Sequence, residues 1–145
     1  MNTDYQVDNS IITQGAKANL TGKTFELQCE KLLKDRGIEY EKQVPYTNLY
    51  GSNRCRIDLV VDGLHIECKF QNVSGSVDEK LPFCLHNLEQ FDGGIVVLGG
   101  NHWYTDRGLK IREWADEAKA EGMFSSHVVT FEEFENNLDF YLTNS

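Results

Sequence analysis

The stretch from Arg54 to Gln71 constrains the fold of this chain more than any other part of it. Two segments of alternating apolar residues flank the dipeptide Asp62-Gly63. Asp-Gly is strongly favoured in the two-residue type I′ turn, in which both turn residues need a positive φ. The stretch therefore predicts a β-hairpin, and the turn sets the register between its two strands.

That register divides the hairpin into an apolar face and a polar face, because successive side chains of a strand point to opposite sides. The apolar face, which we expect in the core, consists of Cys55, Ile57, Leu59, Val61, Leu64, Ile66, Cys68 and Phe70. The polar face consists of Arg56, Asp58, Val60, His65, Glu67, Lys69 and Gln71. The predicted pairs are Val61 with Leu64, Leu59 with Ile66, Asp58 with Glu67, Ile57 with Cys68 and Arg56 with Lys69.

Asp58 and Glu67 form an unfavourable pair on the polar face. Directly opposed side chains lie roughly 4.5–5.5 Å apart at Cβ, and like charges there are destabilising. A hard divalent cation relieves the repulsion, and Mg²⁺ is typically held by one or two carboxylates together with substrate phosphates. Lys69, on the same face, can reach a water or phosphate beside such a metal. Two carboxylates and a lysine on one face suit metal-assisted phosphodiester hydrolysis. The alternative is a solvated hairpin face with an incidental Glu67–Lys69 ion pair.

Asp58, eight intervening residues and then Glu67-Cys68-Lys69 resemble the signature of the PD-(D/E)XK nucleases, the restriction-endonuclease-like superfamily. The resemblance implies that Asp58 and Glu67 bind the metal together with the backbone carbonyl of Cys68. It implies that Lys69 orients or deprotonates the attacking water. It also implies Mg²⁺ as the cofactor, with Mn²⁺ as a substitute, and double-stranded DNA as the partner. The chain departs from the family pattern at Ile57, where a proline is usual.

A predicted helix precedes the hairpin, from about Gly22 to Arg36. Its apolar residues recur at helical spacing, and they are Phe25, Cys29, Leu32 and Leu33. In the superfamily a glutamate of this helix often approaches the metal, and Glu26 is the best match. An ordinary solvated glutamate is an equally good interpretation of Glu26.

Five polar residues are candidate contacts to DNA phosphates, namely Gln71, Lys80, Arg56, Ser76 and Lys23. The segment from Gly75 to Pro82 resembles a loop in small phage and bacterial members of the superfamily. We expect Ser76 or Asp78 to cap a helix that continues to about Phe91. A polar loop with Tyr50-Gly51-Ser52 precedes the hairpin and could reach a DNA groove.

The remaining elements complete an α/β pattern. We expect a strand over 38–46, a buried strand over 95–98, a helix over 106–121 and a short strand at 128–129. The 106–121 helix should bury Ile111, Trp114, Ala115 and Ala118. A last helix, opened by a Thr130–Glu133 capping box, would offer an apolar face to a partner surface. This face consists of Phe131, Phe134, Leu138 and Tyr141, and it and the N-terminal arm are the candidate contacts between subunits.

The predicted order begins as αβββαβ, which is the restriction-endonuclease-like core of a mixed central sheet flanked by helices. Residues 1–20 are polar and are expected to form an N-terminal arm, and residues 21–145 a single nuclease domain. A chain of 145 residues has the length of one domain with one core.

The formal net charge of −9 runs against DNA binding. Residues 81–145 carry most of the acidic excess, with 4 Lys and Arg against 11 Asp and Glu. Residues 1–80, which include the hairpin, carry 10 against 12 and are nearly neutral. A local basic face in that part of the chain is therefore compatible with DNA.

We therefore expect a Mg²⁺-dependent DNA endonuclease that is site-specific, of the restriction or homing type. The alternatives are a junction resolvase or repair nuclease, and a nuclease-fold regulatory protein that binds without cutting. Cleavage of both strands calls for a homodimer or higher homo-oligomer. No apolar run is long enough to span a membrane and no signal peptide is evident, so a cytoplasmic location in a bacterial or phage-infected cell is expected.

Overall fold

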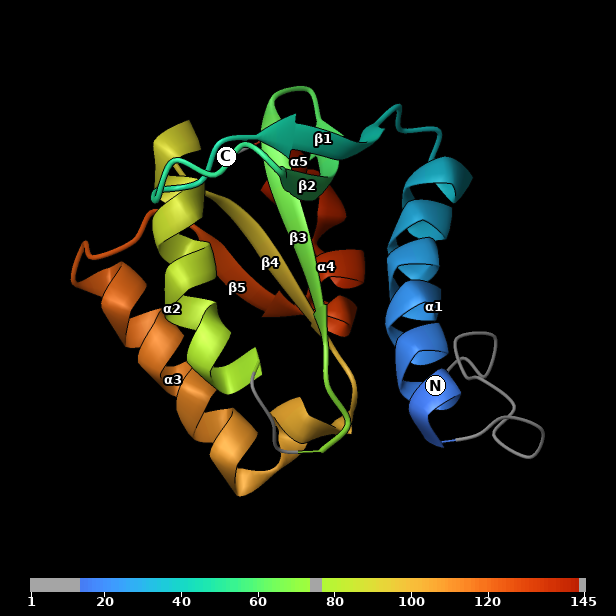
Figure 1. The fold of residues 1–145 in the computed structure, drawn as a ribbon, viewed down its shortest axis with the longest axis vertical. Coiled ribbons are helices and arrows are strands. Elements are labelled where there is room, and N and C mark those ends of the chain that lie inside the picture. Colours follow the sequence, from blue (N-terminus) through green and yellow to red (C-terminus); the bar gives the residue numbers. More distant parts are fainter. Residues whose placement is uncertain (1–13, 74–76, 144–145) are drawn as a thin grey trace.

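The structure of the protein, a computed structural model, describes residues 14–73 and 77–143, with side chains described from residue 22 onward. A central sheet lies between two layers of helices (Figure 1). Its elements in chain order are α1 (Gln14–Asp35), β1 (Glu41–Tyr46), β2 (Cys55–Val61), β3 (Leu64–Phe70), α2 (Val77–Leu88), η2 (Glu89–Phe91), β4 (Gly94–Gly99), η3 (Asn101–Tyr104), α3 (Asp106–Ala120), β5 (His127–Thr130), α4 (Phe131–Asn136) and α5 (Leu138–Thr143).

The sheet has five strands in the order β1-β2-β3-β4-β5. Strands β1, β2 and β3 pair antiparallel, whereas β3, β4 and β5 pair parallel. The predicted αβββαβ order and mixed sheet are therefore confirmed. Strand β4 is buried along its whole length, because helices cover both faces of the parallel part of the sheet.

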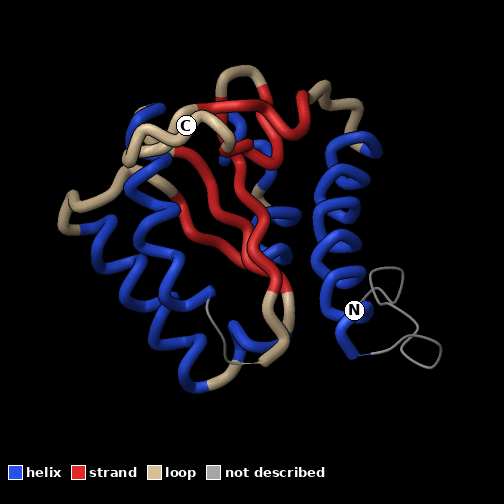
Figure 2. The backbone as a smooth tube through the Cα atoms, viewed as in Figure 1, coloured by secondary structure: helices blue, strands red, loops and turns tan. Residues whose placement is uncertain are grey.

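The two helical layers lie on opposite faces of the sheet (Figures 1 and 2), and each buries its own apolar cluster. Helices α1, α4 and α5 cover one face, where Phe25 and Phe134 pack on strand residues such as Ile66. Helices α2 and α3 cover the other face with Leu85 and Ala118. The central strands thus have apolar contacts on both sides, so any charged group among them is taken out of water.

The Asp62-Gly63 turn is formed as predicted. Asp62 has φ 49° and Gly63 has φ 85°, the two positive values that a type I′ turn requires. The β2–β3 ladder pairs Val61 with Leu64, Val60 with His65, and Leu59 with Ile66. The predicted register is thus confirmed for the three pairs nearest the turn.

Beyond Leu59 the hairpin departs from the predicted alternation. Among the described residues the β2–β3 ladder ends at Leu59 and Ile66. Ile57 is buried in the cluster under α2, on the opposite face of the sheet from Leu59. The prediction that Ile57 and Leu59 share a face is therefore wrong. Side-chain hydrogen bonds of Asp58 and Glu67 connect the strands at this point, so the strict alternation of a regular ladder is interrupted.

The ends of the chain also differ from expectation. Helix α1 begins at Gln14, well before the predicted start near Gly22, and includes residues 14–20 of the predicted arm. Residues 1–13 lie outside the described part. The predicted last helix is two helices, α4 and α5, which meet at Asn137.

The apolar face of those last helices is not available to a partner. Phe131, Phe134 and Leu138 are at most 7% exposed and belong to the core cluster with α1. The prediction that this face contacts another subunit is therefore wrong. The predicted capping box is present, since the Thr130 side chain accepts from the Glu133 N–H and the Glu133 side chain bonds back to Thr130.

Two side chains of the α2–α3 layer are placed differently from the sequence prediction. Trp114 of α3 is 37% exposed and is not a core residue. Asp78 does not cap α2 but lies inside its first turn, where its carboxylate hydrogen-bonds the side chains of His102 and Arg107. No helix in the described part of the chain is long and apolar enough to cross a membrane.

Candidate active site

Asp58 of β2 and Glu67 of β3 are linked by a reciprocal pair of hydrogen bonds. The Asp58 N–H donates to Glu67 Oε1 over 3.0 Å, and the Cys68 N–H donates to Asp58 Oδ2 over 2.8 Å. Each carboxylate is thereby fixed by the backbone of the other strand. These bonds hold the two acids close together. Glu67 is 9% exposed and Asp58 is half-buried, so both have limited access to water.

Burial makes this pair of acids costly to ionise together. Burial, and then the negative charge of Asp58, raise the pKa of Glu67 to about 7. Burial also raises the pKa of Asp58, although the Cys68 N–H and the charge of Lys69 oppose that shift. A cation placed against these carboxylates would favour their ionised forms.

Lys69 provides the nearest positive charge. Its Nζ lies 3.6 Å from Glu67 Oε2, and its side chain is 28% exposed. Burial lowers the pKa of Lys69, but the neighbouring negative groups, Glu67 and Asp58 among them, outweigh that effect and raise it. The amine is therefore an ammonium at neutral pH and acts as a hydrogen-bond donor.

Glu26 of α1 approaches the same carboxylates. Burial, and then the charge of Asp58, raise the pKa of Glu26, which is the effect of a nearby like charge. Glu26 is therefore close enough to Asp58 for their charges to interact, and its role as a metal ligand stays a prediction.

Gln43 of β1 joins Glu26 to Asp58 and was not found from the sequence. Its Nε2 donates to Glu26 Oε1 over 3.2 Å, and its side chain also hydrogen-bonds Asp58. The β1–β2 register places Gln43 opposite Asp58, but that pair is missing from the ladder among the described residues. Gln43 has φ 53°, a strained value for a side-chain-bearing residue within a strand. Only the pairing of β1 with β2 reveals this position, because the local sequence carries no signal for it.

The chemistry of the donors fits a hard divalent cation. Asp58 and Glu67 offer buried carboxylate oxygens, which are the ligands that Mg²⁺ prefers. No group of three or more His, Cys, Asp or Glu side chains in the described residues is arranged to hold a metal. A metal here would therefore need oxygens from outside this side-chain set, such as a backbone carbonyl, water or a phosphate. The Cys68 carbonyl remains a predicted ligand.

The predicted phosphate contacts differ in how accessible they are. Lys23 of α1, Arg56 of β2 and Lys80 of α2 are exposed. The charge of Lys23 lowers the pKa of Glu26 and of Asp58, so Lys23 lies on the α1 side of the acidic pair. Ser76 lies outside the described residues.

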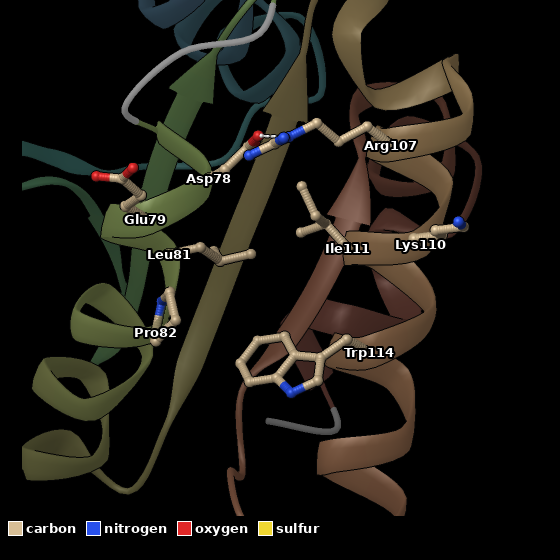
Figure 3. A pocket seen from close by; sticks show the side chains of 8 residues that line it. All are labelled: Asp78, Glu79, Leu81, Pro82, Arg107, Lys110, Ile111 and Trp114. Atoms are coloured by element: carbon tan, nitrogen blue, oxygen red, sulfur yellow. Dashed lines mark hydrogen bonds and ion pairs between the residues drawn. The ribbon is translucent and has the colours of Figure 1, made fainter.

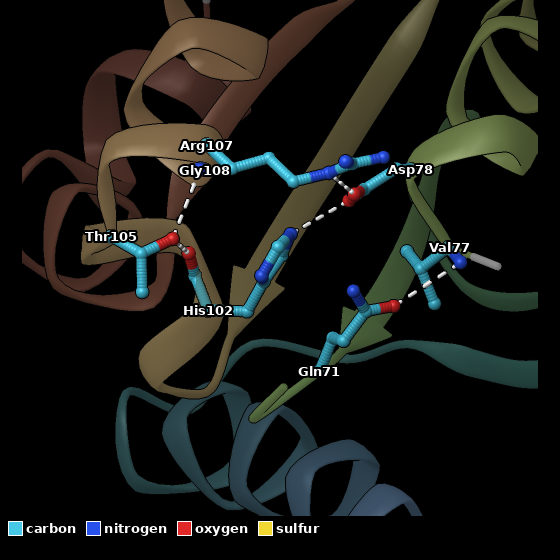
Figure 4. A network of polar contacts seen from close by, with 7 residues as sticks. All are labelled: Gln71, Val77, Asp78, His102, Thr105, Arg107 and Gly108. Atoms are coloured by element: carbon cyan, nitrogen blue, oxygen red, sulfur yellow. Dashed lines mark hydrogen bonds and ion pairs between the residues drawn. The ribbon is translucent and has the colours of Figure 1, made fainter. Parts of the chain in front are cut away.

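Gln71 is in a different environment from those cations. It is 8% exposed, and its Oε1 accepts from the Val77 N–H at the start of α2 (Figure 4). Its Nε2 has no hydrogen-bond partner among the described residues. Gln71 therefore connects the end of β3 to α2. Its amide nitrogen is itself buried, so a contact between Gln71 and a DNA phosphate stays a prediction.

Beside Gln71 lies a polar network that the sequence did not predict. Asp78 Oδ1 lies 2.7 Å from His102 Nε2, and Asp78 Oδ2 accepts from Arg107 Nε over 2.6 Å (Figure 4). His102 is 1% exposed and the Asp78 side chain 5%. The network connects α2 to η3 and α3, and it contains none of the predicted catalytic residues.

A pocket between α2 and α3 is also separate from the acidic pair. Its volume is about 370 Å³ and its lining residues are Asp78, Glu79, Leu81, Pro82, Arg107, Lys110, Ile111 and Trp114 (Figure 3). Asp58, Glu67 and Lys69 do not line it. The predicted catalytic groups therefore lie where β2 and β3 separate, and not in this pocket.

One of the comparisons with known proteins identifies a family. The model of a family described as a PD-(D/E)XK nuclease superfamily domain matches residues 9–137, which is most of the chain. Searches of curated proteins and of solved structures found no match. The matched range includes all the residues considered above for the site.

The backbone strain at Gln43 can be measured with two substitutions. Gln43→Ala removes the amide and keeps a β-carbon at positive φ, whereas Gln43→Gly removes both. We expect the glycine variant to be more stable than the alanine variant by about 1 kcal/mol, the typical cost of a positive φ. Urea unfolding of the two proteins measures the difference. Equal stabilities, or a more stable alanine variant, would show that residue 43 is not held in a strained conformation.

Ionisation of Glu67 should destabilise the metal-free fold. Because the pKa of Glu67 is raised to about 7, its favourable contribution is complete below the unfolded value near 4.5 and is lost as the pH rises through 7. Glu67→Gln retains an oxygen for the Asp58 N–H but carries no charge. In EDTA this variant should exceed the wild type in stability at pH 8, by on the order of 1–3 kcal/mol, and the gap should close towards pH 5. A gap that is the same at both pH values would contradict this account.

Proposed function

The chain belongs to the PD-(D/E)XK nuclease superfamily, and we propose that it is a metal-dependent DNA endonuclease of the site-specific, restriction or homing type. Family membership implies a nuclease-type phosphodiester hydrolase, and such nucleases generally use divalent metal ions. The observation that carries the proposal is the reciprocal bonding of Asp58 and Glu67 with the Lys69 ammonium 3.6 Å from Glu67.

Each member of this group has a distinct role in the proposal. Asp58 and Glu67 hold Mg²⁺, or Mn²⁺ in its place, together with the Cys68 carbonyl. When bound, the ion supplies Lewis-acid stabilisation and lowers the pKa of bound water. Lys69 donates a hydrogen bond to the attacking water and positions it against the phosphate. Its raised pKa favours positioning over proton abstraction.

Glu26 and Gln43 complete the proposed site on the side of α1. Glu26 is close enough to Asp58 for their charges to interact, so it is proposed to approach the metal through a bridging water. Gln43 hydrogen-bonds both acids and fixes their separation. A neutral amide can do this without adding charge to an already acidic site.

DNA would approach over exposed cations, of which Lys23 lies on the α1 side of the acidic pair. Lys23, Arg56 and Lys80 are solvent-exposed and are the proposed phosphate contacts, with Gln71 as a further candidate. Ser76 lies outside the described residues and stays a predicted phosphate contact. Phosphate contacts give affinity that falls with salt and does not depend on sequence. Their number is small, which accords with an acidic protein that binds DNA at one local surface.

Double-strand cleavage adds a requirement for assembly. One active site cuts one strand at a time, so clean double-strand breaks call for a homodimer or a larger closed assembly. The apolar face of α4 and α5 cannot form that contact, because it is buried in the core of its own subunit.

Substitution of Lys69 should reduce DNA cleavage and leave the fold intact. We expect Lys69→Ala to reduce cleavage of plasmid DNA in Mg²⁺ by at least 10²-fold, within the range that a positioned proton donor or acceptor contributes. Asp58→Ala should have a comparable or larger effect, and both variants should remain folded by circular dichroism. Lys110→Ala, which changes an exposed lysine of the α2–α3 pocket, is the matched control and should cut normally. Near wild-type cleavage by Lys69→Ala would remove Lys69 from the mechanism.

The acidic pair should also make thermal stability depend on metal. Binding to the folded state alone stabilises by about 2.7 kcal/mol at a hundredfold excess over Kd, which raises Tm by several degrees. Mg²⁺ or Mn²⁺ should thus raise the Tm of the wild type. Asp58→Ala should lose most of this metal-induced rise in Tm. Glu113→Ala, at an exposed acid of α3, should keep it; an undiminished metal shift in Asp58→Ala would place the metal elsewhere.

A further inference from the structure

The loop between β1 and β2 is closed by the side chain of Asn48. Asn48 Oδ1 accepts from the Tyr50 N–H over 2.9 Å and from the Ser52 N–H over 3.0 Å. The Asn48 N–H donates to the Ser52 carbonyl, and the Gly51 N–H donates to the Asn48 carbonyl. A polar loop with this many internal bonds has a defined shape, and the shape determines where Tyr50 lies.

A second anchor attaches the loop to α2. The Leu49 N–H donates to Asn87 Oδ1 over 2.9 Å, and Asn87 is 3% exposed. The attachment sets the Tyr50 ring on the Phe83 ring of α2, with 5.0 Å between centroids and 21° between the ring planes. Tyr50 is nevertheless 84% exposed. One face of Tyr50 is thus held against Phe83, and the other is open to solvent.

The stacked pair, Tyr50 with Phe83, lies beside the proposed catalytic groups. Phe83 immediately precedes Cys84, which packs in the same buried cluster as Ile57, the residue next to Asp58. Burial raises the pKa of Cys84 to about 12, and the charges of Lys69, Glu67 and Asp58 also act on it. At the other end, the loop starts directly after β1, where Tyr46 has its pKa raised by burial and then by the charge of Glu67. Both attachments of the stacked pair therefore neighbour the acidic site.

The cations around the stacked pair are available to phosphate. Lys80 lies one turn before Phe83 on the same side of α2, and Arg54 and Arg56 follow the loop. In the described part of the chain none of these three residues forms an ion pair. The surroundings therefore complement a polyanion whose bases can lie flat on an aromatic ring.

We propose that the open face of Tyr50, backed by Phe83, stacks on one unpaired nucleobase of the DNA substrate next to the bond that is cut. The inference rests on the proposed nuclease function and narrows its substrate. Bases inside a duplex expose only their edges, so a ring that is free on one face can take a base only at a strand end, a branch or an extruded position. The substrate class is therefore DNA with an unpaired base near the scissile phosphate.

The test compares binding of two duplexes that carry the fluorescent base 2-aminopurine, unpaired in one and paired in the other. Binding is measured in EDTA and again in Ca²⁺, so that the readout does not depend on Mg²⁺-driven cleavage. We expect the wild type to favour the duplex with the unpaired base and to quench its fluorescence. Tyr50→Phe should behave like the wild type. Tyr50→Ala should lose about 5- to 150-fold in affinity for the unpaired duplex alone, the range for stacking of one base.

Two further variants test the geometry. Tyr104→Ala, which removes another exposed tyrosine, 51% exposed on η3, is the matched control and should leave both affinities unchanged. Asn48→Asp keeps an oxygen for the loop N–H groups and should retain the preference, whereas Asn48→Ala should weaken it. Because Tyr50 is so exposed, its substitution should leave the Tm unchanged.

The outcomes separate this inference from the proposed function. If the wild type cuts plasmid DNA but Tyr50→Ala binds both duplexes as the wild type does, or loses affinity equally for both, base stacking on Tyr50 is wrong and the nuclease proposal stands. If the wild type neither binds these duplexes nor cuts DNA in Mg²⁺, both proposals fail. A selective loss in Tyr50→Ala, with normal behaviour of Tyr50→Phe and Tyr104→Ala, supports the stacking inference.

Discussion

The site depends on two backbone N–H groups that bond to carboxylates instead of to the neighbouring strand. The Asp58 N–H bonds Glu67, and the Cys68 N–H bonds Asp58, at the point where the β2–β3 ladder ends. A buried N–H needs a partner, and here the acids provide it. The same bonds fix both carboxylates, so the geometry of the site is set by the point at which the ladder ends.

The surrounding fold determines how the charges of these acids behave. Apolar clusters on both faces of the sheet exclude water from Glu67, and its pKa is raised to about 7. Lys69 offsets part of the negative charge, but with Asp58 and Glu26 nearby the acids outnumber it. The protein therefore holds an incompletely neutralised acidic group at the edge of its core. Such a group destabilises the fold and favours the binding of a cation.

In the loop from β1 to β2, neutral amide side chains hold the backbone in place. Asn48 and Asn87 use neutral side chains to satisfy backbone N–H groups, and the result is that the Tyr50 ring is held against Phe83 of α2. Gln43 acts likewise between two acids. In a chain with a net charge of −9, neutral amides can fix geometry close to the site without adding further repulsion.

The sequence by itself determined the hairpin. The Asp62-Gly63 turn is local, and once it forms, the period of two along each strand brings Asp58 towards Glu67. The tertiary structure alone decided which residues join them. Gln43 lies opposite Asp58 because β1 pairs with β2. Ile57 and Leu59 pack on opposite faces of the sheet because the β2–β3 ladder ends between them. The apolar face of α4 and α5 is buried because α1 packs in the same core cluster. These outcomes could not be predicted from local patterns, because each depends on contacts between segments far apart in the chain.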